Sequence, residues 1–286
     1  MKRVRKYLSI IKPIIYYYLV AIIFTLGMLI ISYTINIILG LNSSKYDFER
    51  NIYTEESRFF DVLLRAIFVV IYYIWYRRLN SKDKTLSRTK YITANDLRFF
   101  LFLGFGDLFL TYGVLNLLLG FITKYFPQVA SNYNSKVSLM KEGSLILVVL
   151  CSAILSPIYE ELLFRGVILK KAKDLMPFYT ANILQALLFA IIHMNWIQLI
   201  YTFPAGLLYG YLTYKYQSIF PSIFLHIFSN ACSIFISNNS DIIEEHINIS
   251  IWFFMALTLA GMIIFIISYF MMKRNIPIKG KAVEKI

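Results

Sequence analysis

Residues 144–165 read SLILVVLCSAILSPIYEELLFR, an apolar run that is long enough to span a membrane and ends in three ionisable residues. The sixteen residues that precede the glutamates carry no charge. Glu160, Glu161 and Arg165 then follow within sequence that is still apolar. A helix needs roughly 20 apolar residues to cross a bilayer. Ionisable side chains are costly at membrane depth, so a group of them in such a run indicates a functional site.

The rest of the chain has the same apolar character. Of its 286 residues, 58% are hydrophobic and 17% are aromatic, which is more apolar surface than a water-soluble fold can bury. The long apolar runs are 13–40, 101–122, 144–164 and 251–272, and the shorter or interrupted ones are 59–76, 178–193, 199–214 and 219–236. We therefore predict an all-α integral membrane protein, a bundle of about eight transmembrane helices.

Charged residues are distributed unevenly over the connections between these runs. The N-terminus, residues 77–90, residues 170–173 and the tail from residue 273 are basic, whereas residues 47–56 and 241–245 are mostly acidic. This alternation is the positive-inside pattern and predicts that both termini are cytoplasmic. The net charge of +13 is then explained by basic flanks that face anionic lipid headgroups, so we expect no nucleic-acid partner.

No internal repeat, low-complexity tract or soluble domain is evident, so we interpret residues 1–286 as one polytopic membrane domain. Residues 1–143 hold the N-terminal helices and loops, 144–236 hold the ionisable motifs, and 237–286 hold the last loop, the last helix and a basic tail. The polar segment 124–143 is expected to be a loop or an interfacial segment. Richness in Ile, Asn, Lys and Tyr is typical of an AT-rich genome and favours a bacterial plasma membrane as the location.

Three pairs of functional side chains are separated by four residues, which places each pair on one face of a helix. The pairs are Glu161 with Arg165, Phe189 with His193, and His226 with Asn230. We predict that Glu161 forms a structural ion pair with Arg165. Glu160 points about 100° away from Glu161 and is expected to face a reaction centre. Pro157, one turn earlier, frees a backbone carbonyl in this helix.

Two other ionisable residues in apolar runs have simpler interpretations. Asp107 is expected to partner a polar group such as Asn116. Arg65 is expected either to extend its charged end to the membrane surface or to pair with Asp61, four residues earlier on the same helix. Phe189 is expected to pack rather than to contact substrate. None of these residues is assigned a catalytic role.

The motifs EExxxR, FxxxH and HxxxN occur in this order at residues 160–165, 189–193 and 226–230. The ordered set resembles the CAAX-processing and bacteriocin-processing family of intramembrane proteases, often called CPBP or Abi. All three motifs match without a departure, and the resemblance covers about a third of the chain, residues 144–236. It implies an intramembrane endopeptidase that cuts a peptide or the tail of a membrane protein near the cytoplasmic face.

The resemblance also implies a role for each motif residue. Glu160, helped by His193, would hold and deprotonate the water molecule that attacks the scissile carbonyl. His226 and Asn230 would face the oxyanion that develops there. The helix geometry that the sequence predicts agrees with these roles, because it places Glu160 outside the predicted ion pair of Glu161 and Arg165.

The same family is described as metal-dependent. His193, His226 and Glu160 are the ligands that zinc would take, because zinc binds imidazole and carboxylate groups. The chain lacks HExxH, the motif that places two zinc ligands and a base on one helical face. A metal-free glutamate mechanism and a zinc site are therefore both open.

Two further classes of function fit buried ionisable groups in a membrane. One is a non-catalytic bacteriocin-immunity or regulatory protein that acts by binding another membrane protein. The other is a transporter or channel. An idle scaffold does not need all of Glu160, His193, His226 and Asn230, which favours the protease. The lack of a pseudo-repeat between the two halves of the chain counts against a transporter.

Overall fold

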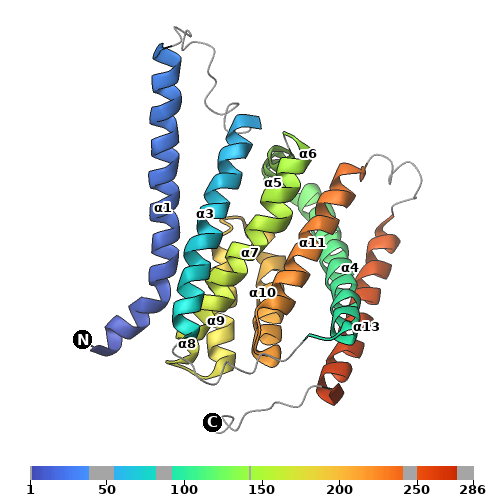
Figure 1. Cartoon of the computed structure of the whole chain (residues 1–286). Coiled ribbons are helices and arrows are strands. Elements are labelled where there is room, and N and C mark those ends of the chain that lie inside the picture. The colour runs from blue at the N-terminus through green and yellow to red at the C-terminus, as the bar shows by residue number, and fades with distance from the viewer. Residues whose placement is uncertain (1, 39–54, 82–91, 142, 241–249, 276–286) are drawn as a thin grey trace.

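The computed structural model describes residues 2–38, 55–81, 92–141, 143–240 and 250–275, and these form a helical bundle (Figure 1). Its separate helices are α1 (Lys2–Ile38), α3 (Glu55–Asn80), α4 (Ala94–Tyr125), α5 (Pro127–Lys141), α9 (Phe178–Ile191), α10 (Trp196–Tyr216), α11 (Phe220–Asn238) and α13 (Ile251–Asn275). A further long helix lies between α5 and α9. No strand occurs within the described ranges. The predicted all-α membrane architecture is confirmed.

Six described helices are long and apolar enough to cross a membrane. They cover Lys6–Ile31, Arg58–Asn80, Ala94–Tyr125, Leu145–Lys173, Phe220–Asn238 and Ile251–Met272. Over most of its described residues, each of the eight predicted apolar runs lies on a helix, but α9 and α10 are not among the six. The 14 residues of α9 span only about 21 Å at 1.5 Å per residue, less than the ~30 Å of a bilayer core.

The long helix between α5 and α9 contains two π-helical segments. It consists of α6 (Leu145–Val148), η3 (Val149–Leu155), α7 (Ser156–Glu161), η4 (Leu162–Leu169) and α8 (Lys170–Lys173). In η3 the N–H of Ser156 donates to the carbonyl of Cys151, five residues earlier. Pro157 has no N–H to give to the next carbonyl, that of Ser152. The Nδ2 of Asn230 on α11 donates to this carbonyl instead, at 2.9 Å, so the predicted free carbonyl is bonded by a motif residue.

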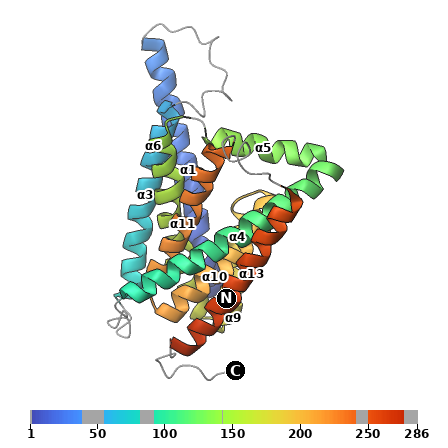
Figure 2. The ribbon, with the colours of Figure 1, turned by 90° about the vertical axis from the view of Figure 1, so that its right-hand side faces the viewer.

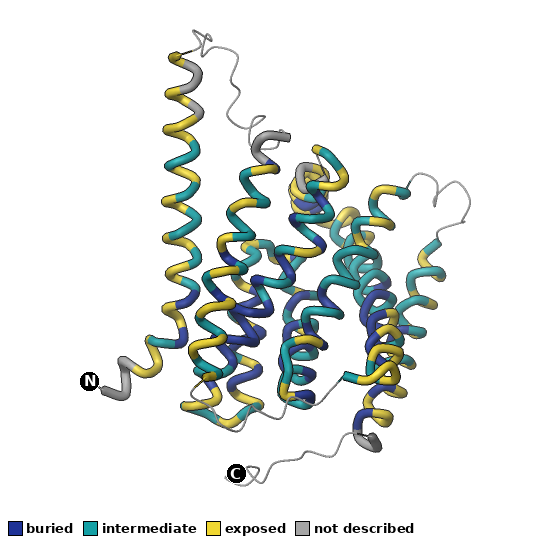
Figure 3. The backbone as a smooth tube through the Cα atoms, in the orientation of Figure 1, coloured by how far each residue is buried: buried dark blue, intermediate teal, exposed yellow. Residues whose placement is uncertain are grey.

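This long helix forms the centre of the bundle. Nine consecutive residues, 161–169, are buried, and η4 packs against α1, α3, α9 and α10. Figure 3 shows the buried positions gathered in the middle of the molecule, whereas α1 is mostly exposed or intermediate. Phe68 and Tyr72 of α3 and Leu163 and Phe164 of η4 belong to one buried apolar cluster. The stretch that carries the glutamates is therefore also the stretch that organises the core.

The last helix packs along α4, and the two cross the bundle together (Figure 2). Small residues permit this close approach, since a Cβ at Gly261 would lie only 2.5 Å from the backbone nitrogen of Leu110. The polar helix α5 runs across one end of the bundle. It lies in the segment that was predicted to be a loop or an interfacial segment, and the structure shows that this segment is mostly helical.

Basic groups gather at one end of the bundle. The first helix begins and α13 ends at this end, where α8 and its lysines also lie (Figure 1). Arg77 and Arg78 lie in the last turn of α3, which runs toward the same end. This is the arrangement that the positive-inside pattern requires, and the cytoplasmic assignment of this end stays a prediction. The acidic residues of 47–49 and 241–245 and the tail from residue 276 lie outside the described residues.

Candidate active site

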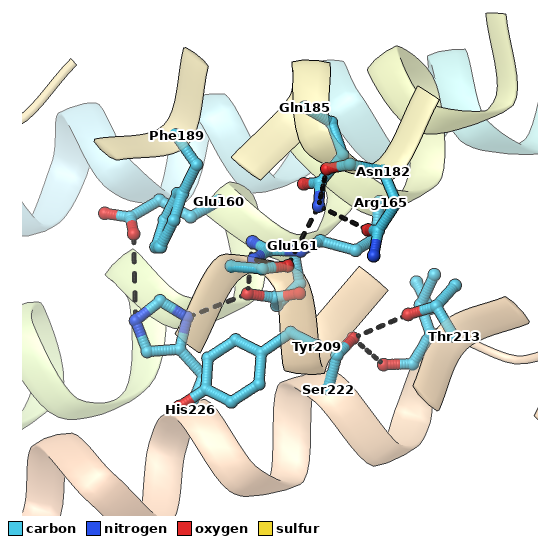
Figure 4. A network of polar contacts seen from close by, with 12 residues as sticks. Glu160, Glu161, Arg165, Asn182, Gln185, Phe189, Tyr209, Thr213, Ser222 and His226 are labelled. Atoms are coloured by element: carbon cyan, nitrogen blue, oxygen red, sulfur yellow. Dashed lines mark hydrogen bonds and ion pairs between the residues drawn. The ribbon is translucent and has the colours of Figure 1, made fainter. Parts of the chain in front are cut away.

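The predicted ion pair is present and fully buried. Nη1 of Arg165 donates to Oε1 of Glu161 at 2.8 Å, and both side chains are 0% exposed (Figure 4). A buried pair is stable only when further contacts compensate for the lost water. Nη2 of Arg165 donates to the carbonyl of Gly206 at 3.2 Å, and the guanidinium lies 4.4 Å from the centre of the Phe189 ring. The pair therefore joins η4 to α9 and α10.

His226 lies between the two adjacent glutamates (Figure 4). Its Nδ1 is 2.9 Å from Oε1 of Glu161, and its Nε2 is 3.8 Å from Oε2 of Glu160. A carboxylate is an acceptor, so the proton on Nδ1 is donated to Glu161 and the ring is held in one orientation. The remaining nitrogen faces Glu160. A separation of 3.8 Å is longer than a direct hydrogen bond but allows one water oxygen to contact both groups.

The two carboxylates have different surroundings, as their positions on the helix predict. The Glu161 side chain is 0% exposed, whereas that of Glu160 is 15% exposed. Within the described part of the chain, Glu160 has a single basic side chain within 4 Å, that of His226 at 3.8 Å. Glu160 is thus a carboxylate at the edge of a buried network, free of the structural ion pair.

The fold explains the position of His193 at the end of α9. Helix α9 ends at Ile191, and Met194 has a left-handed backbone with φ of 49°. Asn195 then caps α10, since its side-chain oxygen accepts the N–H groups of Ile197 and Gln198. His193 therefore lies in the turn between two helices. This position gives it more exposure than a mid-helix residue of the core.

Phe189 is the common neighbour of the two histidines. Its ring meets that of His193 edge-on at 5.0 Å and that of His226 edge-on at 5.8 Å, between ring centres. Nδ1 of His193 is 2.8 Å from the Phe189 carbonyl, so it donates there and leaves Nε2 for another partner. Among described residues His193 makes no ion pair with a carboxylate. The structure therefore brings His226, rather than His193, within 4 Å of Glu160.

The described residues do not form a three-ligand metal site in this arrangement. No group of three or more His, Cys, Asp or Glu side chains among them is placed to hold an ion. Glu160 and His226 approach each other, but the third member of the predicted trio, His193, does not join them. Structural and catalytic zinc sites use at least three protein ligands. No step of the mechanism proposed below therefore passes through a metal.

Two amides on α9 complete the network and were overlooked at the level of sequence. Nε2 of Gln185 donates to the Gly206 carbonyl at 2.9 Å, the same carbonyl that accepts from Arg165. Nδ2 of Asn182 donates to the carbonyl of Leu207 at 3.0 Å. The sequence feature that could have identified them is the pair of amide side chains, Asn182 and Gln185, three residues apart in an otherwise apolar run. They tie α9 to the backbone of α10 beside the buried ion pair.

Substituting Gly210 with alanine is expected to destabilise the protein. A Cβ at this position would overlap Oδ1 of Asn182 and lie 2.7 Å from Nε2 of Gln185. Displacing these amides leaves buried polar groups without partners, at about 1–3 kcal/mol each. Thermal unfolding in detergent measures the change. Gly120→Ala is the control, because no atom lies within 4 Å of that position and alanine favours helix. Equal unfolding temperatures for the two variants would contradict this packing.

Asp107 of α4 reaches the site from outside the motif segment. Its Oδ2 accepts hydrogen bonds from the Tyr209 hydroxyl at 3.2 Å and from the Ser229 hydroxyl at 3.0 Å. The prediction that Asp107 partners a polar group is confirmed, but its partners are Tyr209 and Ser229. Asn116, the example that was expected, instead donates to the Tyr112 carbonyl on its own helix. The physical reason is helical geometry. Nine residues place Asp107 and Asn116 on opposite faces of α4 and about 13 Å apart along its axis.

Substituting Asp107 with alanine is expected to lower stability by about 1–3 kcal/mol, because the buried Tyr209 hydroxyl and the partly buried Ser229 hydroxyl lose their acceptor. The Tyr209 ring centre lies 5.4 Å from that of His226. The substitution therefore also removes the hydrogen bond that holds this ring beside the imidazole. Thermal unfolding checks the effect. Asn116→Ala on the same helix is the matched control, with an expected change within about 0.5 kcal/mol. A larger loss from Asn116→Ala than from Asp107→Ala would refute the assignment.

Arg65 forms the predicted pair on α3. Its Nη1 lies 3.6 Å from Oδ2 of Asp61. The structure adds a contact that spacing did not predict, since Nε of Arg65 donates to the Ser156 hydroxyl at 2.6 Å. Ser156 precedes the proline of the glutamate helix. Arg65 therefore links α3 to α7 one turn before the glutamates.

Comparison with known proteins bears on the same segment. No curated protein and no solved structure matches the chain. A protein family does match, over about a third of the chain, and the matched residues include all three motifs. The resemblance inferred from those motifs is confirmed, because residues 142–232 match the family described as Type II CAAX prenyl endopeptidase Rce1-like.

Proposed function

We propose that this multi-pass membrane protein is an intramembrane endopeptidase in which Glu160 activates the attacking water. The observation that carries the proposal is the 3.8 Å approach of Glu160 to His226 at the edge of a buried polar network. The match to a CAAX-type protease family supports protease activity in general. Glu160 and Nε2 of His226 together offer a water molecule an acceptor and a second contact.

In the proposed reaction, the Glu160 carboxylate takes a proton from water as the water oxygen attacks the scissile carbonyl. His193 helps to hold this water through Nε2, the ring nitrogen that remains after Nδ1 donates to its own helix. When the carbon–nitrogen bond breaks, the proton taken from water passes to the leaving amine. The products are a new carboxyl terminus and a new amino terminus.

The developing oxyanion is proposed to be stabilised by His226 and Asn230. The proton that Glu160 takes from water passes to Nε2 of His226, so that Nε2–H donates to the oxyanion before this proton reaches the leaving amine. Glu161 accepts the Nδ1 proton and is the counter-ion of the ring during this step. The side-chain nitrogen of Asn230 carries two N–H groups. One donates to the Ser152 carbonyl, and the other is proposed to donate to the oxyanion. Arg165 holds Glu161 in place and has a structural role.

We propose a peptide or the tail of a membrane protein as substrate, cut near the cytoplasmic face of a bacterial plasma membrane. The candidate active site lies among apolar helices that exclude bulk water, which suits a hydrophobic or amphipathic peptide. The resemblance links such proteins to bacteriocin maturation, self-immunity and the processing of peptide signals. The lipid bilayer is the expected surrounding.

Cleavage of a host-derived peptide library by purified, detergent-solubilised protein tests this function. Wild type and Glu160→Gln are run side by side, each with and without a zinc chelator. We expect products from the wild type that are missing from the variant. Loss of the wild-type products with chelator would show that a metal takes part. Identical product profiles for wild type and variant would contradict the proposal and favour a protein that acts by binding.

A further inference from the structure

A third carboxylate, on a helix that carries none of the motifs, is separated from the imidazole of His226 by a single side chain. Asp107 is a buried residue in the middle of α4, a helix long and apolar enough to cross a membrane. A carboxylate at such a depth is costly and is a candidate functional residue. Asp107 lies outside the matched residues 142–232, and no step of the proposed reaction uses it.

Tyr209 is the side chain between Asp107 and His226. Its hydroxyl donates to Oδ2 of Asp107 at 3.2 Å. Its ring centre lies 5.4 Å from that of His226, with the two planes at 37° (Figure 4), and the ring of Phe189 contacts the same imidazole edge-on. The hydrogen bond from Nδ1 to Glu161 holds one point of the imidazole and does not by itself fix the tilt of the ring. The two aromatic rings therefore restrict the direction in which Nε2 points.

Asp107 also ties Tyr209 to the helix that carries His226. Ser229 of α11 follows His226 by three residues, and its hydroxyl donates to the same Oδ2 of Asp107 at 3.0 Å. The Tyr209 and Ser229 hydroxyls interact with each other as well. Gly104, one turn before Asp107, permits this close approach, because a Cβ there would lie 2.8 Å from a phenylalanine ring of α11. One carboxylate oxygen thus joins the wall of the imidazole on α10 to the helix of the imidazole itself.

We propose that Asp107 and Tyr209 are positioning residues for peptide cleavage, which hold the imidazole of His226 in the orientation that the reaction needs. This role rests on the proposed function, in which Nε2 of His226 donates to the oxyanion. Neither side chain is proposed to touch the substrate, and both act through the imidazole. A displacement of about 1 Å in a reacting group lowers a rate by up to about 10²-fold, so the effect falls on kcat. Helix α4 is then part of the catalytic unit.

Tyr209→Phe tests this role, because it removes the hydroxyl and leaves the ring. We expect kcat for peptide cleavage to fall by about tenfold while KM stays within about twofold, since the interaction is needed in the transition state. The matched control is Tyr72→Phe on α3. Tyr72 is also buried, and its hydroxyl donates to the Pro13 carbonyl at 2.9 Å. The control loses one buried hydrogen bond as well and should keep the wild-type kcat.

A conservative variant separates the hydrogen bond of Asp107 from its charge. Asp107→Asn keeps an oxygen that accepts from the Tyr209 hydroxyl, whereas Asp107→Ala keeps none. We expect kcat within about threefold of the wild type for Asp107→Asn and about tenfold lower for Asp107→Ala. Rates are measured on folded protein, well below the unfolding temperature of each variant. If Asp107→Ala does not fold, the comparison of Asp107→Asn with Tyr209→Phe decides.

A spectroscopic measurement makes the test independent of cleavage. NMR of protein with isotopically labelled histidines reports the surroundings of both ring nitrogens of His226, whose signals are identified by their loss in His226→Ala. We expect these signals to shift in Tyr209→Phe and to stay in place in Tyr72→Phe. A wild type that cleaves no peptide would defeat the proposed function, and the NMR spectra would still show whether Tyr209 holds the imidazole.

Each outcome supports or overturns the positioning role. A fall in kcat at constant KM together with shifted His226 signals in Tyr209→Phe supports it. Wild-type kcat or unchanged His226 signals in this variant would overturn it. An equal fall in kcat in Tyr72→Phe would also overturn it, because the loss would then follow from stability. Equal losses in Asp107→Asn and Asp107→Ala would assign the effect to the charge of Asp107 and count against positioning by the hydrogen bond.

Discussion

Replacing His226 with alanine is expected to lower kcat/KM for peptide cleavage by about 10²- to 10⁴-fold in protein that still folds. The imidazole is the group that Glu161 orients from one side and Glu160 approaches from the other, at 2.9 Å and 3.8 Å. Alanine removes the donor proposed for the oxyanion and the second contact of the water. The measurement is steady-state cleavage of a peptide that the wild type hydrolyses.

The matched control for His226→Ala is Ser233→Ala on the same helix. Ser233 is exposed, and its hydroxyl donates only to the carbonyl of Ser229 one turn earlier. We expect Ser233→Ala to cleave at the wild-type rate. Folding of the His226 variant is checked by a cooperative thermal transition in the same detergent. Wild-type cleavage by folded His226→Ala would remove this residue from the mechanism.

Replacing Arg165 with methionine is expected to lower the free energy of unfolding by about 3–5 kcal/mol. Both members of the Glu161–Arg165 pair are fully buried, so the substitution leaves an uncompensated carboxylate in the core. Arg165 also contributes its hydrogen bond to Gly206 and its contact with the Phe189 ring. Equilibrium unfolding in detergent, followed by tryptophan fluorescence, measures the loss.

A double substitution separates the ion pair from simple packing. Glu161→Gln removes the charge that Arg165→Met leaves unpaired, so the double variant should be more stable than Arg165→Met alone. This result follows from the cost of an isolated buried charge, which is larger than the net stabilisation by the pair. If the free energy of unfolding lost by the double variant equals the sum of the losses in the two single variants, the two charges do not interact.

The parts of the site that the sequence predicted are those governed by the geometry of a single helix. Glu161 and Arg165 pair because four residues bring them to one face, and the same spacing places His226 and Asn230 together. Local chain geometry alone fixes these pairs, so no knowledge of neighbouring helices was needed. Pro157 also implies a carbonyl without its helical N–H, but the π-helical turn places it at Ser152 and Asn230 of α11 bonds it, which chain geometry alone does not predict.

The parts that the sequence did not predict depend on contacts between helices. Asp107 accepts a hydrogen bond from Tyr209, 102 residues away, and no spacing rule relates the two positions. The Gly206 carbonyl receives two side-chain donors only because α9 and η4 both pack against α10. The π-helical segments that flank the glutamates were likewise not visible, since apolar residues line all sides of this helix. Packing, rather than periodicity, determines these features.

The two adjacent glutamates are expected to have separate functions, and one pair of measurements distinguishes them. Cleavage rate and unfolding temperature are measured for Glu160→Gln and Glu161→Gln in the same detergent. We predict that Glu160→Gln loses cleavage and unfolds at the wild-type temperature, because its side chain is partly exposed and outside the ion pair. We predict that Glu161→Gln unfolds at a lower temperature, because it removes the counter-ion of Arg165. Wild-type cleavage by Glu160→Gln would contradict the account.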